Sequence, residues 1–288
     1  MKVRIGLCQI RPRTGDIEAN LETIRDLTAR ASQEEIDILL FPELALTGYM
    51  ARDELFELAQ PVSGEAVSEL ESIAREYKVY LVVGMPELDE HTFMLYNSAV
   101  VVGPEGLVGT YRKRHLPSYG VFDEARYFKP FRGPIEVFSL SIGRVGVAIC
   151  YDLFFPETVR AMALKGAKLV LVLSAAPGMS REYFETLVKA RAMENTMYVA
   201  YVNLVGHYEG LGFFGGSHMR GPLGELVVSL GLYEEGFAVG EVDYSYLRSA
   251  REARPIIGDI NLRDFDELCN AALHGSLATH QPKNPLEP

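Results

Sequence analysis

Apolar residues along this chain follow two spacings that alternate from the N-terminus onward. Runs rich in apolar and β-branched residues, at Val3–Ile10, Ile36–Phe41 and Val145–Cys150, are typical of strands, and the last of them is continuously apolar, as in a strand buried on both faces. The segment Asn20–Ala31 instead repeats its apolar residues at helical spacing, which predicts an amphipathic helix. Strands that alternate with helices in this way predict an α/β fold with mixed sheets.

The same alternation continues to the C-terminal third. Further strands are expected over Val79–Met85, Ser98–Val102, Gly106–Tyr111, Leu169–Leu173, Tyr198–Asn203, Glu225–Ser229 and Phe237–Val242, and further helices over Val67–Tyr77, Glu157–Lys165 and Arg181–Glu194. No linker, low-complexity tract or repeat divides the chain. We therefore expect one domain over residues 1–288, in which 262–288 forms a C-terminal helix and an irregular tail, free or docked on a partner subunit.

Composition narrows the class of protein. The chain has 288 residues, of which 48% are apolar, and 39 acidic residues against 28 basic ones give a net charge of −11. This acidic balance disfavours nucleic acid as a partner. No apolar run reaches the roughly 18 residues of a membrane-spanning helix, and the N-terminal segment is too short and too alternating for a signal peptide. We expect no membrane association.

The three cysteines, Cys8, Cys150 and Cys269, are widely spaced and odd in number. This pattern predicts neither a disulfide framework nor a metal site. A reducing cytoplasm is the expected location.

Cys150 is the strongest candidate for chemistry. It ends an apolar run, Tyr151 and Asp152 follow at once, and a helix is expected near Pro156. Peptide N–H groups in such a turn stabilise both a thiolate and an oxyanion. For an isolated cysteine, however, a structural role in the core is the commoner one.

Three other candidates stand near the ends of predicted strands. Glu43 follows Ile36–Phe41, Lys113 follows the strand that contains Tyr111, and Glu124 lies in an aromatic loop. A base for a thiol, a cation for an oxyanion and a second acid together suit acyl transfer from a carbon–nitrogen bond. The alternative for Lys113 is a solvated strand end, because it lies in the basic run Arg112–His115.

The segments around these candidates resemble the nitrilase (carbon–nitrogen hydrolase) superfamily. They are FPELALTGY around Glu43, YRKRHLP around Lys113, FDEARYF around Glu124 and GVAICYDLFFPE around Cys150, with RAMENTMYVAYVNLVG and FFGGSHMRGPLGEL further on, so the resemblance spans roughly residues 3 to 250. It implies a four-layer α-β-β-α sandwich, a homodimer or higher homo-oligomer, and no metal or cofactor. It also implies a Glu43, Lys113 and Cys150 triad, with Glu124 positioning the substrate or assisting proton transfer.

The resemblance implies a thioester mechanism. Glu43 takes the Cys150 proton, the thiolate attacks an amide carbonyl, and the Lys113 ammonium and the Tyr151 N–H hold the oxyanion. Ammonia then leaves and water releases a carboxylic acid. The substrate-binding candidates are Tyr119, Tyr127, Tyr151 and Ser174.

The substrate class is narrowed by the residue after the nucleophile. Nitrile-cleaving members usually carry Trp there, and this chain has Tyr151, which favours amides or carbamoyl compounds. KRHLPSYGVFDEARYF and SAAP also resemble the glutaminase domain of glutamine-dependent NAD synthetases, although no SGGxDS-type loop occurs. The alternatives are a glutaminase subunit that feeds ammonia to a separate synthetase, a nitrilase, a soluble acyltransferase and a non-catalytic interaction protein.

Overall fold

Two six-stranded sheets lie face to face in the computed structural model, which describes residues 1–274. The first sheet has the order β14 (Gly236–Asp243), β1 (Lys2–Gln9), β2 (Ile38–Leu40), β3 (Tyr80–Leu88), β4 (Leu95–Gly103) and β5 (Gly106–Arg112). The second has the order β13 (Leu226–Ser229), β12 (His218–Arg220), β9 (Tyr198–Asn203), β8 (Leu169–Ser174), β7 (Gly143–Ile149) and β6 (Phe138–Leu140). A separate hairpin joins β10 (Val205–Tyr208) to β11 (Leu211–Phe214).

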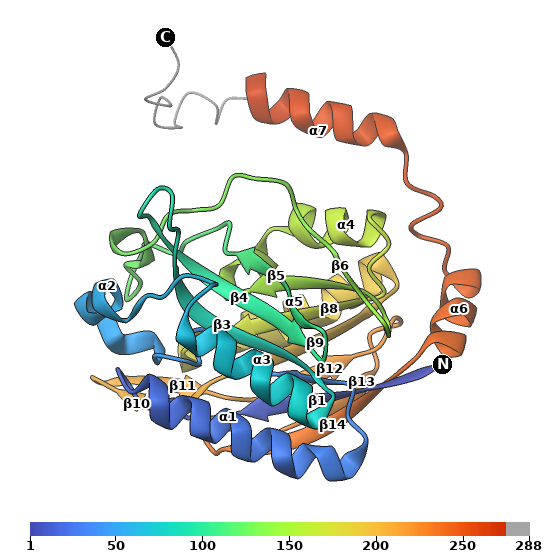
Figure 1. Ribbon diagram of the computed structural model, residues 1–288. Coiled ribbons are helices and arrows are strands. Elements are labelled where there is room, and N and C mark those ends of the chain that lie inside the picture. Colours follow the sequence, from blue (N-terminus) through green and yellow to red (C-terminus); the bar gives the residue numbers. More distant parts are fainter. Residues whose placement is uncertain (275–288) are drawn as a thin grey trace.

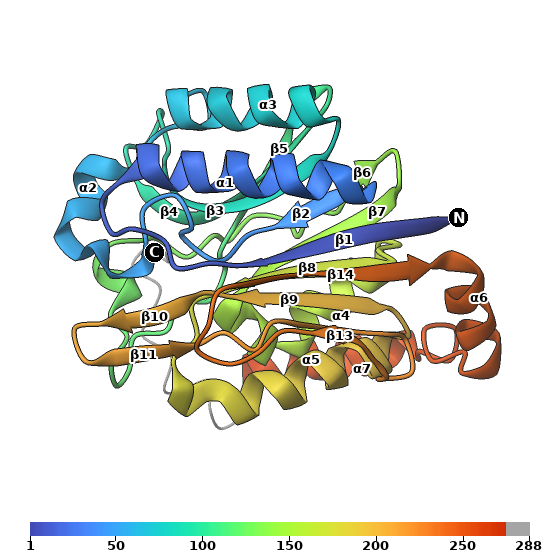
Figure 2. The same ribbon diagram turned by 90° about the horizontal axis from the view of Figure 1, so that it is seen from below.

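Helices cover the outer face of each sheet. Helices α1 (Ile17–Ala31) and α3 (Glu65–Tyr77) lie on the first sheet, and α4 (Pro156–Leu164) and α5 (Arg181–Asn195) lie on the second, so Figure 2 shows four layers. Buried residues of β1, such as Ile5 and Leu7, share one apolar cluster with residues of β7 and β8. The core between the sheets therefore joins both halves of the chain, and the expected α-β-β-α sandwich is confirmed.

Most predicted elements are present, and their bounds move by a few residues. Strand β2 is shorter than the apolar run that predicted it, and β7 ends at Ile149, which leaves Cys150 outside the sheet. Helix α1 begins three residues earlier than Asn20 because the Asp16 side chain accepts a hydrogen bond from Ala19 N. The prediction did not include β6, β10, β11 or β12, which have only three or four residues each.

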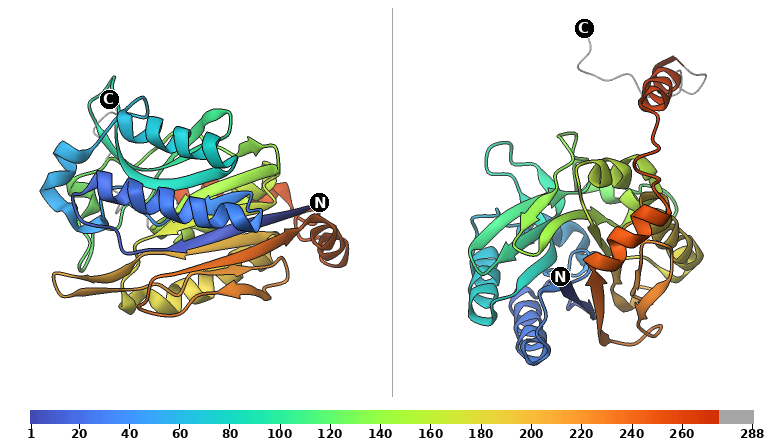
Figure 3. Two further views of the ribbon diagram at one scale, coloured as in Figure 1. Left: turned by 60° about the horizontal axis from the view of Figure 1, so that its bottom comes forward. Right: turned by 90° about the vertical axis from the view of Figure 1, so that its right-hand side faces the viewer.

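The last described helix stands apart from the sandwich. After α6 (Tyr244–Ala253), an extended segment leads to α7 (Leu262–His274), which Figures 1 and 3 show away from both sheets. None of its residues is buried, and Leu262 and Leu273 are among its exposed apolar side chains. A C-terminal helix was expected here; the expected tail and its docking lie outside the described residues.

Among residues 1–274, no helix is long and apolar enough to cross a membrane.

Candidate active site

Four buried side chains meet where strands of the two sheets end. Glu43 follows β2, Lys113 follows β5, Glu124 begins a short 3-10 helix at Glu124–Arg126, and Cys150 follows β7. Glu43 and Lys113 are fully buried, and Glu124 and Cys150 are 3% and 6% exposed. The alternative interpretation of Lys113 as a solvated strand end is therefore excluded.

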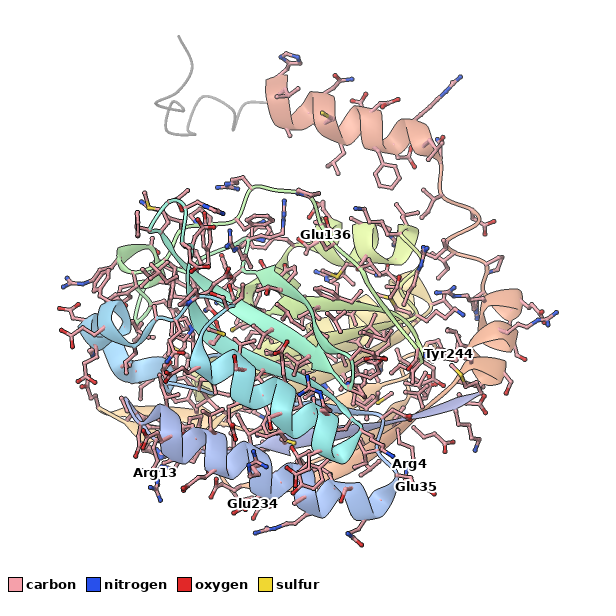
Figure 4. The ribbon with its side chains drawn as sticks, in the orientation of Figure 1. Arg4, Arg13, Glu35, Glu136, Glu234 and Tyr244 are labelled. Atoms are coloured by element: carbon pink, nitrogen blue, oxygen red, sulfur yellow. The ribbon has the colours of Figure 1, made fainter. Side chains whose placement is uncertain are left out.

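Burial sets these charges apart from most others in the chain. Arg13, Glu35, Glu136 and Glu234 lie at the outside of the molecule, as Figure 4 shows. Charged side chains are rarely fully buried unless they are paired, because burial removes their hydration. The cluster therefore needs internal partners.

Lys113 is the centre of a buried ion network. Its Nζ donates to Glu43 Oε1 at 2.6 Å and to Glu124 Oε1 at 2.7 Å. Each carboxylate has a further donor, since Tyr49 OH donates to Glu124 Oε1 at 2.7 Å and Asn97 Nδ2 donates to Glu43 Oε1 at 2.8 Å. Both carboxylates are thus held in fixed positions around one ammonium.

The second oxygens of the Glu43 and Glu124 carboxylates differ in their hydrogen-bond partners. Glu43 Oε2 accepts a hydrogen bond from Ala175 N at 2.8 Å, at the end of β8. Glu124 Oε2 is buried and has no hydrogen-bond partner among residues 1–274. Glu43 therefore links the two sheets, whereas Glu124 keeps one oxygen for another donor.

Cys150 occupies a sharp turn between β7 and a 3-10 helix over Cys150–Phe154. Its φ of 46° is in the left-handed region, which is strained for a residue with a side chain. Such strain persists only where the surroundings hold it. Arg191 contributes from α5, because its Nε donates to Leu153 O at 2.9 Å.

Asp152 holds this turn against the Lys113 strand end. Its Oδ2 accepts from Ile149 N at 3.3 Å and from Tyr111 OH at 2.8 Å. Its Oδ1 accepts from Arg114 N and His115 N and lies 2.9 Å from His115 Nδ1. One buried carboxylate therefore fixes the residues on both sides of Cys150 relative to those that follow Lys113. The His115 ring is stacked on Phe155, with centroids 3.6 Å apart.

Electrostatics keep the Cys150 thiol protonated at rest. Burial raises its pKa first of all, the Glu43 charge raises it further, and the Lys113 ammonium opposes both. Burial disfavours the charged form of Lys113 too, but the charges of Glu124 and Glu43 outweigh it and raise the Lys113 pKa. The cluster thus holds a neutral thiol beside a permanent cation.

Glu124 titrates in a different range from an ordinary carboxyl group. Burial and the Glu43 charge outweigh the opposing effect of Lys113 and raise its pKa to about 7. A neutral thiol, a base within an ion network, a cation and a tunable acid together can perform acyl transfer.

Comparison with known proteins assigns the chain to a family. The model of the family described as "Carbon-nitrogen hydrolase" matches residues 4–252. The chain belongs to this family. It is a carbon–nitrogen hydrolase, as the sequence motifs predicted.

Individual relatives cover most of the hydrolase. A nitrilase of Pyrococcus abyssi is 36% identical over 262 residues, 90% of this chain and 95% of that protein. A glutamine-dependent NAD(+) synthetase of Aquifex aeolicus is 34% identical over 253 residues, 86% of this chain but 44% of that protein, which confirms the likeness to NAD synthetases.

One solved structure shows chemistry at a cysteine. A mutant amidase from Nesterenkonia sp. AN1 is 32% identical, with a TM-score of 0.81 over 92% of this chain and 96% of that one. In that protein the active-site cysteine carries the acetamide moiety of fluoroacetamide.

The four substrate-binding candidates of the hydrolase lie in different surroundings. The Tyr119 and Tyr151 rings lie close together, with centroids 5.6 Å apart, and burial, followed by Tyr151, raises the pKa of Tyr119. Ser174 is fully buried at the end of β8. The Tyr127 ring packs against the rings of Phe56 and Phe128.

The sequence reasoning missed three contributors to the cluster. Tyr49 ends the FPELALTGY segment and was available as a signal. Asn97 lies near the start of β4, one position before the predicted strand Ser98–Val102, and a polar residue there was a weaker signal. The contribution of the Ala175 N–H could not be found from the sequence, because any residue except proline at this position supplies the same peptide donor.

Proposed function

We propose that this carbon–nitrogen hydrolase cleaves the C–N bond of a small amide through a thioester on Cys150 and releases ammonia and a carboxylic acid. The observation that carries the proposal is the buried network in which Lys113 Nζ contacts Glu43 and Glu124 beside a strained cysteine turn. Glu43, Lys113 and Cys150 are the proposed catalytic residues, with Glu124 as the fourth.

In the first half of the reaction, Cys150 Sγ attacks the amide carbonyl carbon while Glu43 accepts the thiol proton. The negative charge that develops on oxygen faces the Lys113 ammonium and the Tyr151 N–H. Glu43 then gives the proton to nitrogen, the C–N bond breaks and ammonia leaves.

In the second half, water attacks the thioester carbonyl carbon and gives a proton to Glu43. The C–S bond breaks, the acid leaves, and the proton returns to sulfur. The free oxygen of Glu124 is suited to accept a hydrogen bond from the substrate amide nitrogen. This would orient the C–N bond toward Glu43.

An amide is favoured over a nitrile as the substrate. Tyr151 stands where nitrile-cleaving members usually carry Trp, and the amidase of known structure supports the same choice. A glutaminase that feeds ammonia to a separate synthetase is the second candidate, because the NAD synthetase relative aligns over 86% of this chain. We also propose a cytoplasmic homo-oligomer.

The test is ammonia release from a panel of small amides, glutamine, carbamoyl amino acids and nitriles. We expect release from at least one amide, with none from the Cys150→Ala protein, and a mass increase equal to the acyl group on rapidly quenched native protein. Release only from glutamine would favour the second candidate. Ammonia release that persists in Cys150→Ala would exclude the thioester mechanism.

A further inference from the structure

Three buried polar atoms close to Cys150 lack hydrogen-bond partners. They are Ser174 Oγ, Tyr201 OH and His218 Nε2, and none has a partner among residues 1–274. All three side chains are at most 3% exposed. Because a buried polar group without a partner is costly, native proteins keep few of them, and a bound ligand is one way to satisfy them.

The three side chains belong to one face of the second sheet. Tyr201 on β9 has Val172 of β8 and His218 of β12 as its cross-strand partners. Ser174 lies two residues beyond Val172, on the same face, and it neighbours the end of β7, where Cys150 follows. The face therefore carries a row that leads from Cys150 through Ser174 to Tyr201 and His218.

Helix α5 closes this row from outside. The Phe184 ring is stacked on the Tyr201 ring, with centroids 5.3 Å apart, and the His218 ring lies 5.4 Å from Tyr201. Burial above all raises the pKa of Tyr201, and the Ser174 hydroxyl lowers the pKa of both Tyr201 and Cys150. Ser174 therefore lies between the Tyr201 hydroxyl and the nucleophile.

The hydrogen-bonding capacity of the row is specific. His218 Nδ1 lies 2.9 Å from Gly216 O, a carbonyl that can only accept, so Nδ1 carries the proton and Nε2 is left as an acceptor. Burial lowers the His218 pKa, which keeps the ring neutral. The two hydroxyl groups can donate or accept.

Nearby charges do not favour an ion. Arg220 lowers the pKa of His218 and Glu185 raises it, so their effects oppose each other. The Glu185 carboxylate also accepts a hydrogen bond from Arg181 Nε. A carboxylate has no proton to give to Nε2. An ammonium would be buried in the row without a counter-ion, because Glu185 is already paired with Arg181. A neutral group that both donates and accepts fits all three atoms.

We propose that Ser174, Tyr201 and His218 form the subsite for the acyl chain, and that this subsite selects amides whose acyl chain carries a neutral hydroxyl or carboxamide group over amides with a plain alkyl chain. The inference rests on the proposed amidase function and names its substrate class. Discrimination is strong in such a site because an alkyl chain leaves the buried polar atoms unpaired.

The test compares 3-hydroxypropionamide with butyramide, in which a methyl group replaces the hydroxyl. We expect the native protein to favour the hydroxyl compound at least tenfold in kcat/KM. Tyr201→Phe should lower this ratio about tenfold. Tyr198→Phe is the matched control, since its hydroxyl bonds the Asp243 backbone at the other end of β9, and the ratio should not change.

A ratio near one in the native protein, or an equal ratio in Tyr201→Phe, would overturn the inference. Calorimetric binding of both amides to Cys150→Ala separates it from the proposed function, because binding needs no turnover. Tighter binding of the hydroxyl compound, weakened by adding Tyr201→Phe, would support the subsite even if the native protein released no ammonia. Equal binding of the two compounds would overturn it.

Discussion

Cys8 and Cys150 are both buried thiols on strands or at their ends, yet their surroundings differ in kind. Cys8 lies within β1, in an apolar cluster with Ile24 and Leu39, and burial alone raises its pKa. Cys150 lies one residue past β7, where Glu43 and Lys113 act on it in opposite directions. Burial by itself therefore does not distinguish a structural thiol from a reactive one. The distinguishing feature is the position of Cys150 at a strand end, where charged side chains can lie beside the thiol.

The largest expected effect comes from removing the Lys113 ammonium, which acts on Cys150 but not on Cys8. Lys113→Met would leave Glu43 and Glu124 buried without their shared partner, which costs about 3–5 kcal/mol of stability by analogy with other broken buried pairs. Amide hydrolysis should fall by more than about 1,000-fold, because the oxyanion loses its charged donor. Urea denaturation and ammonia release measure the two effects.

Lys2→Met is the matched control for that substitution. Lys2 pairs with Glu241 on the surface, where solvent screens the two charges, so stability and ammonia release should change little. Comparable losses of stability and of ammonia release in Lys113→Met and Lys2→Met would mean that the buried network has no special role.

The turn that carries Cys150 is the second difference from Cys8. Asp152→Asn would point an N–H₂ group at donors that now bond a carboxylate oxygen. We expect about 100-fold lower kcat, as a small displacement of the nucleophile produces, with KM less affected. Steady-state kinetics on the best amide of the panel would show it.

Asp89→Asn provides the control for Asp152→Asn. Asp89 also accepts several hydrogen bonds, from Thr92 and Arg112, but outside the cluster. Its substitution should leave kcat within about twofold. An Asp152→Asn protein with native kinetics would show that the Cys150 turn keeps its conformation without the Asp152 carboxylate.

These expectations also show where sequence reasoning ends. Glu43, Lys113, Glu124 and Cys150 could be found because each lies in a recognisable segment. Three of them do follow neighbouring strands, and Glu124 joins them from a short 3-10 helix. The contact between Asn97 and Glu43 joins residues 54 positions apart, one in β4 and the other in the turn after β2, so no local pattern reveals it. The three-residue strands β6 and β12 are equally hidden, since their pairing with long neighbours, not their own composition, makes them strands.

Thiol labelling tests the comparison directly. In folded protein, iodoacetamide should label Cys150 and the exposed Cys269 but not Cys8, which is fully buried. Peptide mass spectrometry after timed labelling gives all three rates. Equal labelling of Cys8 and Cys150 would end the distinction between the two thiols.

The smallest effect concerns Glu124, which has no counterpart near Cys8. Its pKa of about 7 lies above the ordinary value of 4.5, so the folded state holds this proton over a range in which the unfolded chain releases it. Stability contributed by protonated Glu124 is therefore complete below about pH 4.5 and is lost as the pH rises through 7. In Glu124→Gln this dependence is absent, and its stability relative to the native protein should improve between pH 5 and pH 8. Urea denaturation of both proteins at the two pH values measures the change, and the absence of a shift would mean that Lys113 keeps Glu124 ionised throughout.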